Sequence, residues 1–93
     1  MSVNLQQLLK VQHAAQILRN MAEQYLISSS NMQRTQGEIM MEISDLLAAS
    51  KLASAAAKYD HLHQKIKLTL PFEVIDVISK GEQMIENHLK NKV

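Results

Sequence analysis

Apolar residues between Val11 and Leu26 recur at the spacing of an amphipathic helix. Placed at about 100° per residue, they fill one half of a helical wheel, and polar residues fill the other half. Within that half, Val11, Ala15 and Leu18 alternate steps of four and three, as in the seam of an antiparallel bundle. The pattern predicts a first helix over about residues 3–28. Its apolar arc of about 180° is wide enough to contact two neighbouring helices, in this chain or in another.

Three serines at Ser28–Ser30 interrupt this pattern and mark a second start. Ser30 and Gln33 have the spacing of a capping box, so we expect a second helix to begin near Asn31. The short connection favours an antiparallel hairpin. Gly37 is expected to weaken the first turns of that helix. The periodic pattern continues to Leu68, which predicts a second helix over about residues 31–68.

The apolar face of this second helix changes sides near its middle. The face of the first half includes Met40, Ile43 and Leu47. The face of the second half lies roughly 150° away on the wheel, and the switch falls within Ala48–Lys51. Either one straight helix contacts different partners on its opposite sides, or the chain bends or breaks near Ser50. We favour a continuous helix, because no proline stands there to cause a kink.

Pro71 marks the boundary of a third helix, expected over about residues 70–90, because proline suits the first turn of a helix. Gly81 lies at the centre of its apolar arc, which predicts a close crossing with another helix. One competing pattern is the alternation of apolar and polar residues over Ile66–Val74, which has the period of an edge strand. The helical patterns on both sides outweigh it.

The predicted fold class is therefore all-α. Three long amphipathic helices with short connections form one helical domain over residues 1–93, made of a helical hairpin plus a third helix. We expect the bundle to be completed by dimerisation or by a partner protein, because three arcs of this width exceed what a three-helix monomer can bury.

Composition narrows the class of protein. The chain has 93 residues, of which 46% are hydrophobic and 20% are charged, and its net charge is +1. This is the composition of a small globular domain. The absence of cysteine excludes a disulfide scaffold and thiolate chemistry. The first residues have no secretory signal pattern, and no apolar run approaches the ~20 residues of a membrane span, so we expect a cytoplasmic protein.

Histidines and carboxylates are the candidates for chemistry. Asp60 and His63 have the i,i+3 spacing of helical metal ligands, but no further ligands are identifiable on a facing helix. We expect a half-buried, hydrogen-bonded His63 and a solvated His61, and we assign no metal site. His13 and His88 need no function. The carboxylates Glu38, Glu42 and Asp45 share one helix face, and we expect them to be solvated, as repeated acids on the polar side of an amphipathic helix usually are. With no catalytic motif present, we predict no enzyme and no cofactor.

Nucleic acid is the alternative partner. Lys51, Lys58 and Lys65 recur every seven residues and line one side of the second helix, with Lys67 and His61 nearby. The segment 35–47 resembles the opening of a helix-turn-helix unit, but the glycine expected at the turn is missing. Residues 52–59, where a recognition helix would lie, are half alanine and offer little to read base edges. A net charge of +1 also predicts weak attraction to phosphates. A small dimeric DNA-binding regulator is therefore the second hypothesis.

The excess of apolar surface favours protein binding. Methionines, which adapt to varied partners, add to this surface. We predict a non-enzymatic helical protein–protein interaction module of the small chaperone, adaptor or inhibitor type, acting as a homo-oligomer, with a homodimer expected, or as a subunit of a complex. No small-molecule substrate is indicated. The candidate interface is the apolar stripe in the second half of the second helix: Leu52, Ala56, Tyr59, Leu62 and Ile66.

Overall fold

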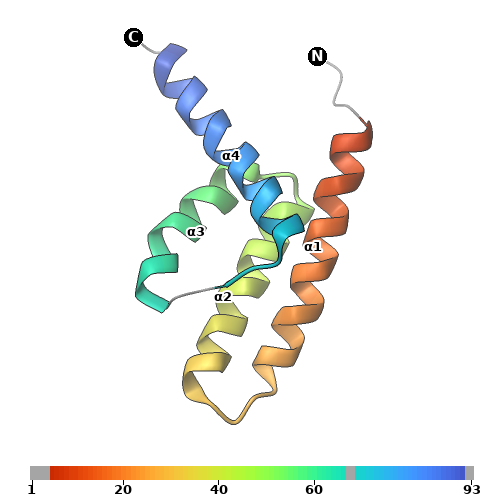
Figure 1. Ribbon diagram of the computed structural model, residues 1–93, viewed down its shortest axis with the longest axis vertical. Helices are drawn as coiled ribbons and strands as arrows, with labels where there is room; N and C mark the ends of the chain where they lie inside the picture. The colour runs from red at the N-terminus through yellow and green to blue at the C-terminus, as the bar shows by residue number, and fades with distance from the viewer. Residues whose placement is uncertain (1–4, 67–68, 92–93) are drawn as a thin grey trace.

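The computed structural model describes residues 5–66 and 69–91, which form four helices joined by short connections (Figure 1). The first two are α1 (Leu5–Leu26) and α2 (Asn31–Ala48), which run antiparallel as a helical hairpin. Ser30 caps α2 as predicted, because its side-chain oxygen accepts a hydrogen bond from the Gln33 N–H at 3.3 Å. The all-helical class is confirmed, and no strand occurs in the described ranges.

The prediction of one continuous second helix is wrong, and so is the count of three helices. The segment expected to be helical over 31–68 is two helices, α2 and α3 (Leu52–Ile66), separated by a turn at residues 49–51. Ser50 has a φ of 59°, in the left-handed region, which ends α2. The two opposed apolar faces are therefore satisfied by a change in chain direction, which brings both faces toward one core.

The second hairpin consists of α3 and α4 (Phe72–Asn91). The Pro71 carbonyl accepts hydrogen bonds from the N–H groups of Val74 and Ile75, both at 3.0 Å, so Pro71 stands at the start of α4 as expected. The alternative strand at 66–74 lies partly outside the described residues. Of the residues inside them, 66 ends α3, 69–71 are irregular and 72–74 are helical.

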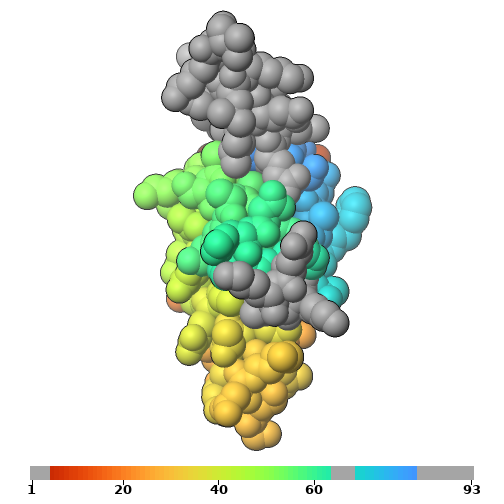
Figure 2. Space-filling model, turned by 90° about the vertical axis from the view of Figure 1, so that its left-hand side faces the viewer, coloured from red at the N-terminus to blue at the C-terminus, as the bar shows by residue number. Residues whose placement is uncertain are grey.

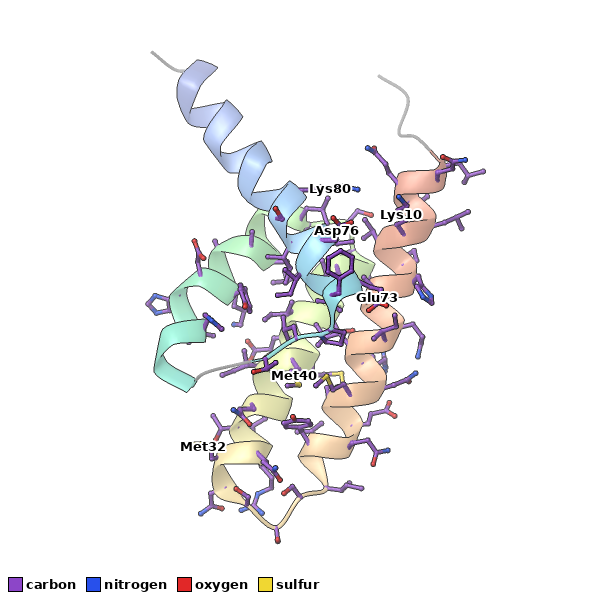
Figure 3. All side chains as sticks on the ribbon, in the orientation of Figure 1. Lys10, Met32, Met40, Glu73, Asp76 and Lys80 are labelled. Carbon is purple, nitrogen blue, oxygen red and sulfur yellow. The ribbon has the colours of Figure 1, made fainter. Side chains whose placement is uncertain are left out.

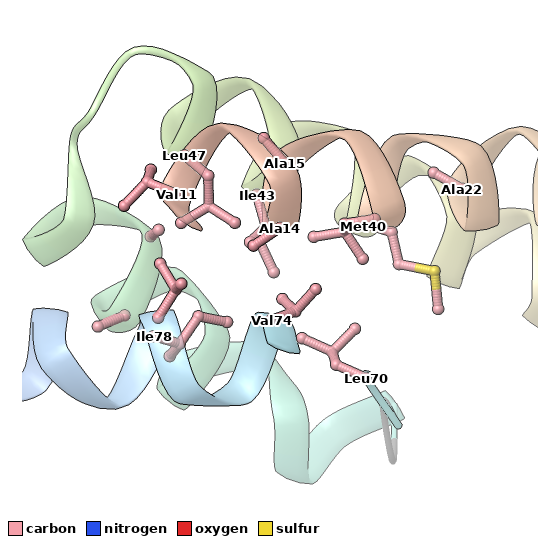
Figure 4. Packing of buried hydrophobic residues seen from close by; sticks show 14 residues of the cluster. Val11, Ala14, Ala15, Ala22, Met40, Ile43, Leu47, Leu70, Val74 and Ile78 are labelled. Carbon is pink, nitrogen blue, oxygen red and sulfur yellow. The ribbon is translucent and has the colours of Figure 1, made fainter. Parts of the chain in front are cut away.

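The two hairpins share one core. In it α1 packs against α2 and α4, and α3 packs against the same two helices (Figures 1 and 4). The core is built from small and branched side chains of all four helices and one residue of the α3–α4 connection. Its buried members are Val11, Ala14, Ala15, Leu18, Ala22, Met40, Ile43, Leu47, Ala55, Ala56, Leu70, Val74, Val77 and Ile78.

Both glycines mark close helix crossings. A Cβ atom on Gly37 would lie 2.9 Å from the backbone nitrogen of Leu26, where α2 crosses α1. A Cβ atom on Gly81 would lie 2.3 Å from the carbonyl oxygen of Leu52, where α4 crosses α3. The close crossing predicted at Gly81 is confirmed. Gly37, expected only to weaken a helix start, is instead buried and admits the backbone of α1.

Candidate functional site

The predicted interface stripe begins at the first residue of α3. Ala56 is fully buried, whereas Leu52, Tyr59 and Leu62 are half-buried. Leu52 and Ala56 form the surface on which Gly81 of α4 rests. Part of the stripe thus packs within the chain. The side chain of Ile66 lies outside the described residues, and the crossing of this stripe between two chains stays a prediction.

The histidine pair on α3 divides as the wheel predicts, with one correction. His61 is exposed, and His63 is half-buried with its ring stacked on Tyr59 at 4.7 Å between centroids. The hydrogen bond expected for His63 is not formed at Nδ1, a buried atom that has no partner in the described structure. Across the described residues, no three His, Asp or Glu side chains lie close enough together to hold a metal ion. The side chain of His88 lies outside the described part.

Acidic residues of α2 lie close to lysines of the α2–α3 turn and of α3. Glu42 and Asp45 of α2 line a shallow groove together with Lys51 and Lys58. Within it, the Lys58 ammonium forms an ion pair with the Glu42 carboxylate. This pair joins one carboxylate of the acidic face to one lysine of the predicted lysine row. Figure 2 shows the face on which α2 and α3 lie side by side.

The break at Ser50 changes one argument about nucleic acid. A residue with positive φ does stand between two helices there, although the glycine usual at such a turn is absent. The second argument remains, because the exposed positions of α3 offer no arginine, asparagine or glutamine among the described side chains. They are Ser54, Ala57, Asp60 and His61.

A second apolar surface was missed at the sequence level. Residues 5–10 are all exposed, and they include Leu5 at 67%, Leu8 at 36% and Leu9 at 59%. The wheel carries the signal, because Leu9 lies nine residues before the buried Leu18 and so about 180° from it. Leu5, Leu9 and His13 follow one another at i,i+4 spacing and form one row along α1, which we call the α1 ridge.

A groove between α1 and α4 borders the α1 ridge. Lys10 and His13 form its α1 wall, and Phe72, Glu73, Asp76 and Val77 form its α4 wall. Figure 3 shows Lys10 on one helix facing Glu73 and Asp76 on the other. Phe72 is 79% exposed at the rim of this groove.

The tip of the α1–α2 hairpin carries two further exposed apolar residues, Ile27 at 79% and Met32 at 65%. Figure 1 shows this tip extending beyond the α3–α4 hairpin, so no other helix of the described chain covers it. Of the other methionines, Met40 is buried, and Met21 and Met41 are half-buried against the core. Most of the methionines that the structure places therefore fill the core.

Comparison with protein families, curated proteins and solved structures finds no match for this chain. None of the helices in residues 5–66 and 69–91 combines the length and the apolar character that a membrane crossing needs.

Proposed function

We propose that this protein is a non-enzymatic helical interaction module that binds another protein through α1. One observation carries the proposal: two large apolar residues, Leu5 and Leu9, stand exposed on the α1 ridge, on successive turns of one helix. Single exposed apolar residues are ordinary on soluble proteins, but clustered ones are typical of binding surfaces. The wider class is that of small cytoplasmic chaperones, adaptors or inhibitors, in which the chain works as an oligomer or as a subunit of a complex.

The chemistry of the surface indicates an amphipathic helix as the partner. The α1 ridge supplies apolar contacts, and Phe72 supplies an aromatic anchor across the groove. Between them, Lys10 lies on one wall, and Glu73 and Asp76 lie on the other. A helix whose apolar residues recur every three or four positions would meet both anchors, and charges at its edges would pair with the walls.

The test replaces the two ridge leucines by acids. We expect Leu5→Glu with Leu9→Glu to abolish capture of the partner from the native host, because two charges would lose solvation in the interface. Both side chains are already exposed, so the melting temperature should stay within a few degrees of the parent. Tagged pull-down with quantitative mass spectrometry measures the captured partner, and light scattering measures the mass of the purified protein.

The matched control is Gln6→Glu with Gln7→Glu, which adds the same two charges to the same exposed turns without removing an apolar side chain. This control should retain capture. If the leucine variant and the control capture the same proteins in the same amounts, the α1 ridge is not the interface and the proposal fails.

DNA binding is the second candidate, favoured by one observation: the helix–turn–helix arrangement of α2, residues 49–51 and α3. Gel-shift titration against salt separates the two functions. Binding to phosphates weakens steeply as salt rises, whereas an apolar protein interface persists. Lys51→Gln should lower any DNA affinity and leave capture of a protein partner unchanged.

A further inference from the structure

The turn between α2 and α3 is one that the local sequence forms poorly. The Ser50 N–H donates to the Leu47 carbonyl at 2.9 Å, and the Lys51 N–H donates to the Leu46 carbonyl at 2.8 Å. These two bonds define a Schellman motif, in which glycine usually holds the position that Ser50 occupies. With a φ of 59°, Ser50 brings its Cβ atom too close to backbone, which raises the free energy of the turn.

The start of α3 is also poorly capped. The Lys51 carbonyl accepts from the Ala55 N–H at 3.0 Å, which places Lys51 at the N-cap. A lysine side chain has no acceptor atom, so it cannot satisfy the first amide groups of α3. The first turn of α3 contains no acidic residue that would complement the helix dipole. In a continuous helix, these amides would donate to the carbonyls of the preceding turn.

The residues around the turn favour that continuous helix. Segment 47–57 contains six alanines and two leucines, the strongest helix formers. Residues 48–51 are all exposed, so the turn itself contributes nothing to the core. Packing between the two hairpins keeps the turn closed, through contacts of α1 with α4 and of α2 with α3. The α3–α4 hairpin of a second chain offers the same side chains for those contacts.

We propose that the α2–α3 turn is a hinge for domain swapping, in which two copies of this chain exchange their α3–α4 hairpins. In the swapped dimer, α2 and α3 of each chain form one helix from residue 31 to residue 66, about 54 Å long. The packing inside each hairpin stays within one chain, whereas the packing between hairpins and the Glu42–Lys58 ion pair form again between chains. The exchange removes the left-handed Ser50 and the uncapped start of α3. It uses the core and not the exposed leucines of the α1 ridge, and the α1–α4 groove forms again between the two chains.

Substitutions at Ser50 move the equilibrium in opposite directions. Ser50→Gly suits the left-handed turn and weakens the continuous helix, whereas Ser50→Ala keeps the Cβ clash and strengthens the helix. Each dimer contains two hinges. We therefore expect Ser50→Gly to raise the dimer dissociation constant at least roughly tenfold above that of Ser50→Ala. Both proteins are refolded at millimolar concentration and then analysed by size exclusion with light scattering.

Cross-linking distinguishes a swapped dimer from a docked one. The chain has no cysteine, so His13→Cys with Glu73→Cys introduces the only thiols, and both line the α1–α4 groove. A short bis-maleimide should join them within one chain in the monomer and between two chains in the dimer. The matched control is Gln12→Cys with Ala48→Cys, because Gln12 Nε2 donates to the Ala48 carbonyl at 3.0 Å within the first hairpin. That pair should be joined within one chain in both states.

Denaturing gels of the separated fractions decide the outcome. Linked chain pairs from the dimer with the groove thiols, and single chains with the control thiols, support the swap. A dimer whose groove thiols stay joined within one chain overturns it and indicates surface docking instead. A parent and Ser50→Ala variant that both remain monomeric after refolding at millimolar concentration overturn it as well. Neither result bears on capture through Leu5 and Leu9.

Discussion

At the residue scale, Ser44 joins α2 to α1 through a buried hydrogen bond. Its Oγ donates to the Ala15 carbonyl at 2.8 Å, and the residue is 2% exposed. We expect Ser44→Ala to lower the free energy of unfolding by about 1 kcal/mol, the usual contribution of one such bond. Urea denaturation measures the change. Ser79→Ala on the exposed face of α4 is the control and should stay within about 0.5 kcal/mol of the parent.

Gly81 is the second decisive residue, because α3 leaves no room for a side chain there. The added Cβ atom of Gly81→Ala would meet the Leu52 carbonyl oxygen at 2.3 Å and the Ala56 Cβ at 3.2 Å. Alanine favours the helix by about 1 kcal/mol over glycine, but overpacking costs about 1–3 kcal/mol. The backbone of Leu52 cannot move aside as easily as a flexible side chain would. We expect a net loss of stability and a lower melting temperature. A melting temperature above that of the parent would mean that α4 moves away from α3 without cost.

At the scale of the element, the start of α2 depends on its cap. The Ser30 side chain accepts from the Gln33 N–H, and the Ser30 N–H donates in turn to the Ser28 hydroxyl at 3.1 Å. Ser30→Ala should destabilise the protein by about 1 kcal/mol, and Ser30→Asp should retain most of the stability. Thermal melting followed by circular dichroism compares the two variants. Equal losses for alanine and aspartate would contradict the capping role.

At the scale of the whole molecule, we predict self-association through the predicted interface stripe of α3. Tyr59 and Leu62 are half-buried, so acids at both positions would disturb any chain that packs on them. We expect Tyr59→Glu with Leu62→Glu to give a smaller and less stable species in which α1 stays helical. Sedimentation measures the mass. A parent that is a well-folded monomer at tens of micromolar, with no partner recovered from its host, would contradict the prediction.

Local patterns predicted the parts of this fold that depend on local forces. The start of α2 at Asn31, the role of Pro71 and the buried side of α1 were all readable, because caps, proline geometry and helical periodicity act within a few residues. The candidate site was harder to predict from the sequence. The periodic pattern identified Ala56 and Leu52 as apolar contacts, and the structure shows that Ala56 is fully buried and contacts Gly81 of α4. A helical wheel predicts which face is apolar but not which helix packs against it.

The sequence alone predicts the all-helical class and the start of the second helix of the first hairpin. It also predicts the two opposed apolar faces of segment 31–68. The break at Ser50 was decided by the tertiary structure. Every local preference there, from the alanines to the missing glycine and the missing cap, favours a continuous helix. Breaking the helix turns both apolar faces toward one core, where Leu47 of α2 and Ala55 of α3 are fully buried. Burial of that core stabilises the chain by more free energy than the turn costs. This balance depends on contacts between helices that are distant in sequence, so the local sequence pattern does not reveal it.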